Sequence, residues 1–378
     1  MSTPDYRVRL FMTVDLVGST AYKMSSSRDK KNQATPHPAW VQQFRQFYRQ
    51  FPETLKSKYK STPHGQTTAP EQPGCPEVWK TIGDEILFCC RVTSVQHVAC
   101  CVQAFLASLD EFGRYLEQNE IPLDVKGSGW LAAFPAENIS IQILSDGLSD
   151  SGDLGLPTED FEREVDRAPH KFDFLGTGID TGFRISKNAS TDKFTASVGL
   201  AWVLCDAAVH NHFNGTFDYH GREPFKGVNR DQPYPVVTIL SERDEQKRTL
   251  RERERLVRGE DHASPLALRD FLNSFMEHVA IDAPKLPLLD GGGPIRPPES
   301  YERYISAWAS GANEAEKRDE ILDDGEKPSA DSFKDDPLPE DVLQGRKLGK
   351  RIQPGPITLE IKGEHARVRA TPRGDPEK

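Results

Sequence analysis

The chain has 378 residues, 36% of them hydrophobic, and a net charge of −10. This length suffices for one large domain with an appendage, and the negative charge argues against a protein that binds nucleic acid through a basic surface. The six cysteines have no metal-binding spacing, the N-terminus lacks the apolar core of a signal peptide, and no stretch reaches the roughly 18 apolar residues of a membrane span. We therefore expect reduced cysteines, a cytoplasmic location, and no membrane or nucleic-acid partner.

The first elements in chain order are a strand, a long helix and a pair of strands. Residues 7–17 form an apolar run that predicts a buried strand, ended by Gly18-Ser19-Thr20 and followed by a polar loop. Residues 39–60 carry apolar side chains at three- and four-residue steps, which predicts a helix. Residues 77–92 predict two strands around a tight turn at Gly83-Asp84.

The middle of the chain alternates between helices and strands. The predicted elements are a helix at 94–119, a strand at 123–134, a polar insertion at about 136–170, a strand at 171–175, a helix at 177–189, a strand with a short helix at 194–209, and a strand pair within 223–240. This order predicts an α+β domain in which helices cover one face of a mostly antiparallel sheet.

The remainder of the chain has a different composition. A charged helical run at 241–259 and a helix near 264–280 precede a segment rich in Pro, Gly and acidic residues. We expect residues 310–350 to be mostly disordered and residues 357–371 to form a late hairpin. The predicted domains are therefore a catalytic domain at 1–245 and a helical, partly disordered tail at 246–378.

Two segments place carboxylates where they can bind metal ions. Asp15 lies at the end of the first predicted strand, before Gly18, Ser19 and Thr20, and backbone amides in such a turn can hold phosphate oxygens. Asp84 lies in the hairpin turn of K80-T-I-G-D84-E-I. If the two strands are neighbours, Asp15 and Asp84 can share hard divalent cations such as Mg²⁺ or Mn²⁺.

These segments resemble the metal-binding strand and metal-binding hairpin of class III adenylate and guanylate cyclases. A third segment, F172-D173-F-L-G-T-G-I-D180-T-G-F-R184, is similar to the family pattern D-x-x-G-x-x-V-N-x-x-x-R, and a fourth is F225-K226-G227-V228. Each segment is weak alone, but the four occur in the family order over residues 7–240. The resemblance implies the ferredoxin-like cyclase fold.

The resemblance also implies roles for individual residues. Asp15, the backbone of Leu16 and Asp84 would hold two metal ions, Lys80 and Asp173 would contact the base, Gly18, Ser19, Thr20 and Lys226 would approach the triphosphate, Asp180 would orient the ribose, and Arg184 would stabilise the transition state. The family works as a head-to-tail dimer, so a homodimer with two shared sites is implied.

One residue departs from the family pattern. Asp180 lies where the family usually has Asn, and an ionised carboxylate cannot donate a hydrogen bond as an amide does. It can accept one from a ribose hydroxyl instead. The ribose-orienting role of Asp180 therefore differs from that of the family residue.

The side chains of Lys80 and Asp173 restrict the base. Lys80 donates and Asp173 accepts, whereas guanine presents two donors, so GTP is disfavoured. Adenine, cytosine and uracil each offer an acceptor and a donor, so edge chemistry leaves ATP, CTP and UTP open.

The insertion before FDFLGTGIDTGFRI, together with that stretch, resembles bacterial pyrimidine cyclases of Pycsar antiphage defence. That resemblance implies conversion of UTP to cyclic UMP, with CTP as the close alternative, and a product that acts on a separate effector.

Two other classes of function stay open. One is a catalytically dead cyclase-like module for dimerisation or nucleotide sensing. The other is a diguanylate cyclase, although the double Gly and the Phe of its signature are absent from I-G-D-E-I.

Overall fold

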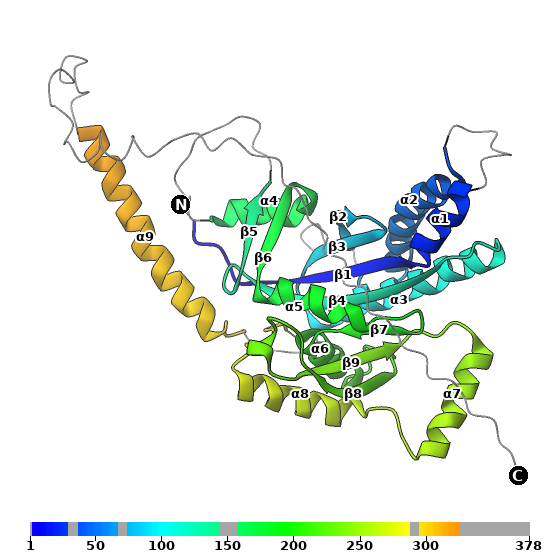
Figure 1. Cartoon of the computed structure of the whole chain (residues 1–378). Coiled ribbons are helices and arrows are strands. Elements are labelled where there is room, and N and C mark those ends of the chain that lie inside the picture. Colours follow the sequence, from blue (N-terminus) through cyan, green and yellow to red (C-terminus); the bar gives the residue numbers. More distant parts are fainter. Residues whose placement is uncertain (1, 29–36, 67–73, 144–156, 288–294, 325–378) are drawn as a thin grey trace, which may run out of the picture. The chain divides into compact units, whose positions relative to one another are not determined.

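The computed structural model describes residues 2–28, 37–66, 74–143, 157–287 and 295–324 (Figure 1). The chain divides into two compact units, residues 1–318 and residues 319–378. In the second unit only residues 319–324, the end of one helix, are described. The hairpin expected at 357–371 lies outside the described residues.

A seven-stranded sheet organises the first unit. Its strands are β1 (Arg7–Val17), β2 (Glu77–Ile82), β3 (Glu85–Val92), β4 (Asp124–Phe134), β7 (Lys193–Ala196), β8 (Phe217–Glu223) and β9 (Tyr234–Leu240). They lie in the order β2-β3-β1-β4-β7-β9-β8. Among these neighbouring pairs, β4–β7 is parallel and the others are antiparallel, which confirms the α+β class and the mostly antiparallel sheet.

The helices and a second, two-stranded sheet complete the described structure. The helices are α1 (Ser19–Arg28), α2 (Ala39–Lys60), α3 (Val95–Gln118), α4 (Glu159–Arg167), α5 (Thr177–Ile185), α6 (Val198–Val209), α7 (Glu245–Arg258), α8 (Pro265–Val279) and α9 (Glu299–Asp324). The small sheet pairs β5 (Asn138–Gln142) with β6 (Phe172–Gly176). None of the described helices is long and apolar enough to cross a membrane.

Several boundaries differ from the sequence expectations. Residues 19–28 form α1 rather than a loop, because Gly18 at φ +86° ends β1 and the chain turns directly into a helix. The first strand of the last pair is 217–223, earlier than expected. The insertion contributes β5 and α4 to the fold, and residues 310–324 belong to α9 rather than to a disordered segment.

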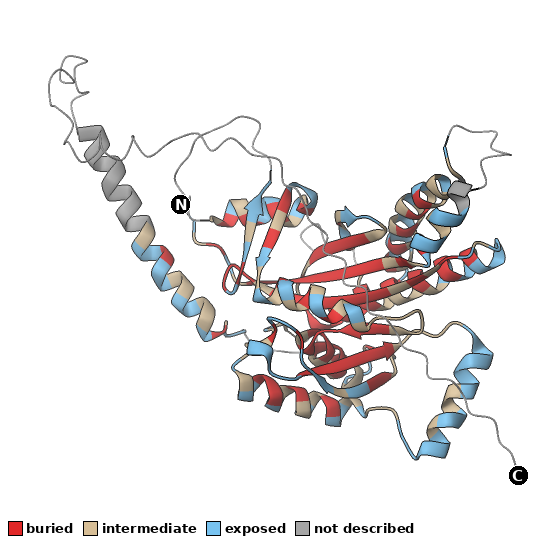
Figure 2. Ribbon diagram, viewed as in Figure 1, coloured by how far each residue is buried: buried red, intermediate tan, exposed pale blue. Residues whose placement is uncertain are grey.

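One face of the large sheet carries the main hydrophobic core. Even-numbered residues of β1, such as Leu10, Met12 and Val14, pack there with Phe47 and Phe51 of α2 and with apolar residues of α3, α6 and α8. The buried residues lie along the strands and on the inward sides of these helices (Figure 2). This packing follows from the period of two in a strand and the 3.6-residue period of a helix.

The opposite face of the sheet is also covered, contrary to the single helical layer expected. Phe11 of β1 stacks on Trp130 of β4 with ring centroids 5.5 Å apart, and both pack with Phe174 of β6 in a second aromatic core. Helix α4 of the insertion thus supplies part of a second layer, because α4, β6 and α5 bury apolar residues such as Val165, Phe172 and Ile179 against this face.

Buried ion pairs fix α4 to the start of β1. Arg7 pairs with Glu159 and, at 2.7 Å, with Asp166. Arg9 pairs with Glu162 at 2.7 Å and with Asp166 at 2.6 Å. Both arginine side chains are at most 1% exposed. A buried charge requires a partner of opposite sign, so these contacts determine where α4 lies.

A stacked pair of histidines predicts pH-dependent stability. His97 of α3 is fully buried, its ring lies 4.0 Å from that of His64, and burial lowers the pKa of His97 to about 4. Burial, with the neighbouring His97 second, also lowers the pKa of His64 to about 4. Both side chains titrate near 6.5 when unfolded, so between pH 6.5 and 4 the unfolded chain binds more protons.

We therefore expect the free energy of unfolding to fall as the pH falls from 7 towards 5.5. For His97 alone the linkage amounts to about 1.2 kcal/mol over this interval. Denaturant unfolding at pH 7.0, 6.2 and 5.5 tests this in the wild type and in His97→Gln, which keeps hydrogen-bonding groups but does not titrate. An equal loss in both proteins would contradict the assignment to His97.

Candidate active site

Asp15 and Asp84 meet at the end of β1. Asp15 lies on β1 opposite Glu85 of β3, and the turn between β2 and β3 places Asp84 beside it. The backbone N–H of Leu16 donates to the Asp84 carbonyl at 3.2 Å, which joins the strand end to the turn. Asp15, Asp84 and Glu85 line one hollow of about 190 Å³.

The neighbouring backbone explains how the turn is held. Gly83 has φ +63°, as the tight turn requires, and the Tyr48 hydroxyl of α2 donates to the Gly83 carbonyl. The Ser19 hydroxyl donates to the Asp84 carboxylate. Gly18 cannot carry a side chain without strain, since its φ is +86° and a Cβ would lie 3.3 Å from the Pro122 carbonyl oxygen.

The charges in this hollow are partly balanced by a residue that sequence reasoning missed. Lys126 of β4 lies opposite Asp15, with its Nζ 3.3 Å from the Asp15 carboxylate. Burial raises the pKa of Asp15; Lys126 opposes that shift and Asp84 adds to it. Burial likewise raises the pKa of Glu85, against a hydrogen bond from Thr13.

The donor set suits a hard divalent cation in chemical type. Asp15, Asp84 and Glu85 offer carboxylate oxygens, with the hydroxyl of Thr13 nearby. Within the described ranges, no group of three or more His, Cys, Asp and Glu side chains has an arrangement that could hold a metal ion. A cation here therefore needs further oxygen ligands from outside the protein, as Mg²⁺ often takes from phosphates.

Lys80 and Asp173 form a second group. The Lys80 ammonium donates to the Asp173 carboxylate at 2.7 Å, although the two residues lie on β2 and β6. A bulge in β2 after Val78 turns both Trp79 and Lys80 toward β6, and the Trp79 indole donates to the Phe172 carbonyl at 2.9 Å. The Lys80 ammonium also lies 4.0 Å from the centre of the Trp79 ring.

Asp180 and Arg184 share the outer side of α5. They are four residues apart on the helix and both are exposed, so their side chains lie on one face. The inner side packs closely: a Cβ at Gly182 would lie 2.1 Å from the Trp130 ring. Neither Asp180 nor Arg184 lines the hollow of Asp15, although Ser186 and Lys187, just beyond α5, do.

The other predicted residues divide between two places. Ser19 and Thr20 begin α1 beside Asp84, where the first backbone N–H groups of the helix are available. Lys226 lies in the connection after β8, which is the edge strand opposite β2. Within one chain, Lys226 is therefore not brought to the carboxylates.

The geometry within one chain is therefore divided. Asp15, Leu16, Asp84, Ser19 and Thr20 come together at the end of β1, and Lys80 with Asp173 forms a separate ion pair. Lys126 could have been found only from the strand register, because it lies opposite Asp15 but is distant from it in sequence, whereas Glu85 directly follows Asp84 in the hairpin segment.

Comparisons with known proteins give only remote similarities. No protein-family model and no curated protein matches the chain. Among solved structures, it is similar to the adenylyl cyclase CyaB from P. aeruginosa, with 11% identity, a TM-score of 0.40, and coverage of 64% of this chain and 97% of that one. The guanylyl cyclase Cya2 matches at 15% identity and a TM-score of 0.34, over 64% and 96%. The guanylate cyclase domain of RhGC from Catenaria anguillulae, in complex with GTP, matches at 10% and 0.36, over 64% and 100%.

Proposed function

We propose that this protein is a nucleotide cyclase that converts UTP to 3′,5′-cyclic UMP and pyrophosphate. The observation that carries the proposal is the meeting of Asp15 and Asp84 in one hollow, beside the Ser19 end of α1. These are the residues that resemble the metal-binding pair of class III cyclases, and the fold brings them together from separate strands.

The proposed reaction is an intramolecular substitution. The ribose 3′ oxygen attacks the α-phosphorus, its proton is lost, and the bond from the α-phosphorus to the bridging oxygen of pyrophosphate breaks. Two Mn²⁺ or Mg²⁺ ions, held by Asp15, Asp84 and the Leu16 carbonyl, would neutralise the phosphates and acidify the 3′ hydroxyl. The phosphates complete the set of oxygen ligands that the carboxylates alone do not supply.

The protein's own groups then orient the substrate. The first amides of α1, at Ser19 and Thr20, would donate to phosphate oxygens, since the dipole of the helix favours negative charge at its N-terminus. Lys126 can shift from Asp15 toward a phosphate once a cation neutralises that carboxylate. Arg184 supplies positive charge as pyrophosphate leaves, and Asp180 accepts a hydrogen bond from a ribose hydroxyl.

The choice of base rests on Lys80 and Asp173. A base that enters between them must accept from Lys80 and donate to Asp173, since the two side chains now satisfy each other at 2.7 Å. Uracil does so with a carbonyl and its neighbouring N3–H. CTP and ATP offer the same pair of contacts, so cytidylate cyclase and adenylate cyclase activity are the alternatives. The preference for UTP rests on the resemblance to pyrimidine cyclases of antiphage defence. In that setting cyclic UMP acts as a second messenger on a separate effector.

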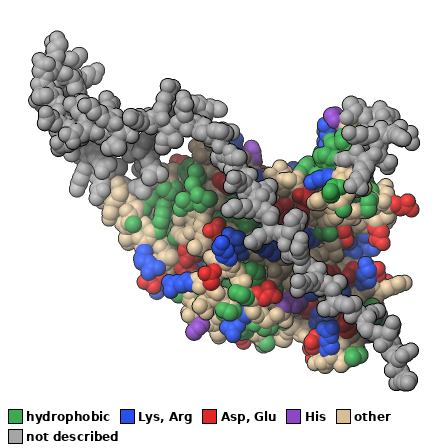
Figure 3. Space-filling view, viewed as in Figure 1, with side chains coloured by type: hydrophobic (Ala, Val, Ile, Leu, Met, Phe, Trp, Pro, Cys, Tyr) green, Lys and Arg blue, Asp and Glu red, His purple; other side chains and the backbone are tan. Residues whose placement is uncertain are grey.

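A homodimer with shared sites is part of the proposal. Asp180 and Arg184 are exposed and do not reach the hollow of Asp15 in one chain, so a second copy would bring them there. The small sheet also exposes apolar side chains, at Ile139, Ile141 and Leu175, each more than 40% exposed. Figure 3 shows hydrophobic side chains gathered over β5 and β6, where a partner surface can cover them.

A second candidate is a catalytically dead module that binds nucleotides or dimerises. The contact between Lys126 and Asp15 favours it, because a lysine that remained paired with a metal-binding carboxylate would oppose cation binding. The products formed from nucleoside triphosphates decide between the two.

The first test concerns the product. Purified protein is incubated with Mn²⁺ and with ATP, CTP, GTP or UTP in four separate reactions, and the products are identified by mass spectrometry. We expect the reaction with UTP to give the most cyclic product, as cyclic UMP. If cyclic CMP or cyclic AMP is the main product, the proposed active site stands but the proposed preference for UTP is wrong. No cyclic product from any of the four would favour the dead module.

The second test removes a metal ligand. Asp84→Ala should reduce cyclic product at least about 100-fold, as expected when an essential electrostatic partner is lost. Its melting temperature should fall by only a few degrees, because the exposed turn loses one hydrogen bond from Ser19, worth about 1 kcal/mol. Asp110→Ala, at an exposed position of α3, is the matched control and should retain full activity. Full activity of Asp84→Ala would disprove the metal assignment.

The third test examines sharing of sites between two chains. Mixed Asp15→Ala and Arg184→Ala proteins, each inactive alone, should recover about a quarter of wild-type activity, since half of the dimers contain one intact site of two. Asp15→Ala mixed with Asp84→Ala is the control, because both changes affect the same half of a site, and it should stay inactive. Lack of recovery in proteins shown to exchange subunits would contradict shared sites.

A further inference from the structure

A large hollow of about 1230 Å³ opens between α2, the β2–β3 hairpin and α4. Its lining shares no residue with the hollow of Asp15 and Asp84. We call it the basic hollow, since its wall includes Lys56 of α2, Arg91 of β3, and Arg163 and Arg167 of α4. Its size exceeds that of pockets that hold drug-sized ligands, about 300–1,000 Å³.

The charge of this lining differs from that of the chain. Four permanently positive side chains face two carboxylates, Glu77 and Asp166, whereas the whole chain carries −10. The cations come from three separate elements, and Arg163 and Arg167 lie four residues apart on one side of α4. A ligand with several negative groups can therefore contact cations from more than one direction.

Asp166 is already neutralised by other arginines. Its two carboxylate oxygens lie 2.7 Å from Arg7 and 2.6 Å from Arg9, whereas the Arg91 guanidinium approaches only to 3.7 Å. Burial, and then the charge of Arg7, lower the pKa of Arg91. Arg91 thus carries a positive charge that the surrounding protein stabilises poorly, and an anion in the basic hollow would stabilise it.

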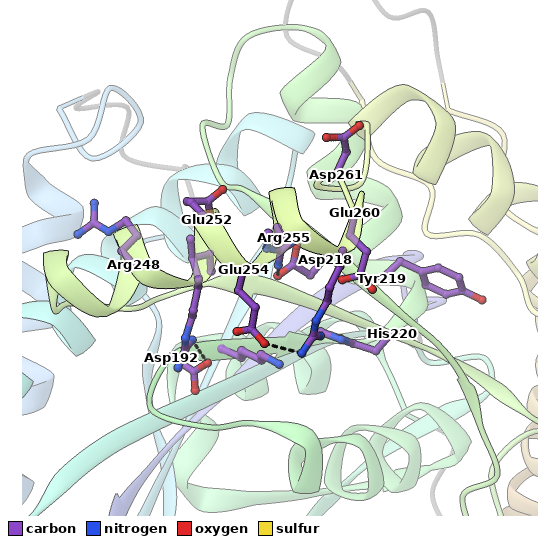
Figure 4. Close-up of a pocket in the computed structure, with 14 residues that line it drawn as sticks. Asp192, Asp218, Tyr219, His220, Arg248, Glu252, Glu254, Arg255, Glu260 and Asp261 are labelled. Atoms are coloured by element: carbon purple, nitrogen blue, oxygen red, sulfur yellow. Dashed lines mark hydrogen bonds and ion pairs between the residues drawn. The ribbon is translucent and has the colours of Figure 1, made fainter.

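A second charged hollow, of about 530 Å³ beside α7, provides a contrast (Figure 4). There, Arg251 pairs with Asp192, Arg255 pairs with the buried Asp218, and Arg258 pairs with Glu254. These arginines attach α7 to the sheet or pair along the helix itself. In the basic hollow, Arg163 also pairs along its own helix, with Glu159 at 3.0 Å, but the four cations of the lining outnumber its two carboxylates, Glu77 and Asp166.

We propose that the basic hollow is a second ligand site, which binds a molecule with a diphosphate group, such as a nucleoside diphosphate. Guanidinium groups bind phosphate oxygens through paired N–H donors, so Arg163, Arg167 and Arg91 are suited to two linked phosphates. Pro52 and Val78 also line the hollow and offer apolar surface to the organic part of the ligand. Binding there needs no metal ion, unlike binding of a triphosphate at Asp15 and Asp84.

The experiment measures binding in the presence of EDTA, which removes metal-dependent binding at the candidate active site. Isothermal titration of the full chain at low salt with ADP, UDP and inorganic pyrophosphate should show one site per chain. The double variant Arg163→Ala/Arg167→Ala should weaken binding at least tenfold, and Arg91→Gln should weaken it separately. Circular dichroism and melting curves establish that each variant is folded, and both α4 positions are exposed.

Two matched controls separate this site from its surroundings. Lys171→Ala removes an exposed cation just after α4 that does not line the basic hollow, and Asp84→Ala alters the candidate active site. Both should bind the probes as the wild type does. The proposal is overturned if no probe binds, if Lys171→Ala weakens binding as much as the arginine changes do, or if only Asp84→Ala alters binding.

Discussion

The alternation of side chains along β1 is the constraint on which the rest of the structure depends. Because β1 is paired on both sides, with β3 and β4, its register cannot slip without exchanging its two faces. Even-numbered residues enter the main core. Odd-numbered residues meet three environments in turn: Arg7 and Arg9 are ion-paired to α4, Phe11 is stacked among aromatic rings, and Thr13 and Asp15 face the polar hollow.

The buried arginines, Arg7 and Arg9, also affect the position of the Lys80–Asp173 ion pair. Removing each of the two guanidinium groups from water costs several kcal/mol of free energy. The carboxylates of α4 offset this cost only when the helix lies where they can pair with Arg7 and Arg9. The 3-10 turn Pro169–Lys171 follows α4 and leads into β6, which carries Asp173. The fixed position of α4 therefore helps to bring Asp173 to Lys80, and it also forms one wall of the basic hollow.

The candidate site is built from like charges held close together in one hollow. Burial raises the pKa of both Asp15 and Glu85, the charge of Asp84 adds to each of these shifts, and Lys126 opposes them. A divalent cation bound with phosphate oxygens would supply the missing positive charge. Asp180 and Arg184 on the exposed side of α5, and the exposed apolar residues of the β5–β6 sheet, lie outside this hollow.

The sequence by itself determined the local features: the strand of residues 7–17, the helices with regular apolar spacing, the Gly83-Asp84 turn, and the order of the carboxylates. These depend on periodicity and turn chemistry within short segments. Only the tertiary structure decided that α4 helps to cover the second face, that Lys126 pairs with Asp15, that Lys80 meets Asp173, and that Lys226 lies at the opposite edge. Those facts depend on strand register and layer packing between residues far apart in the chain, which no local pattern encodes.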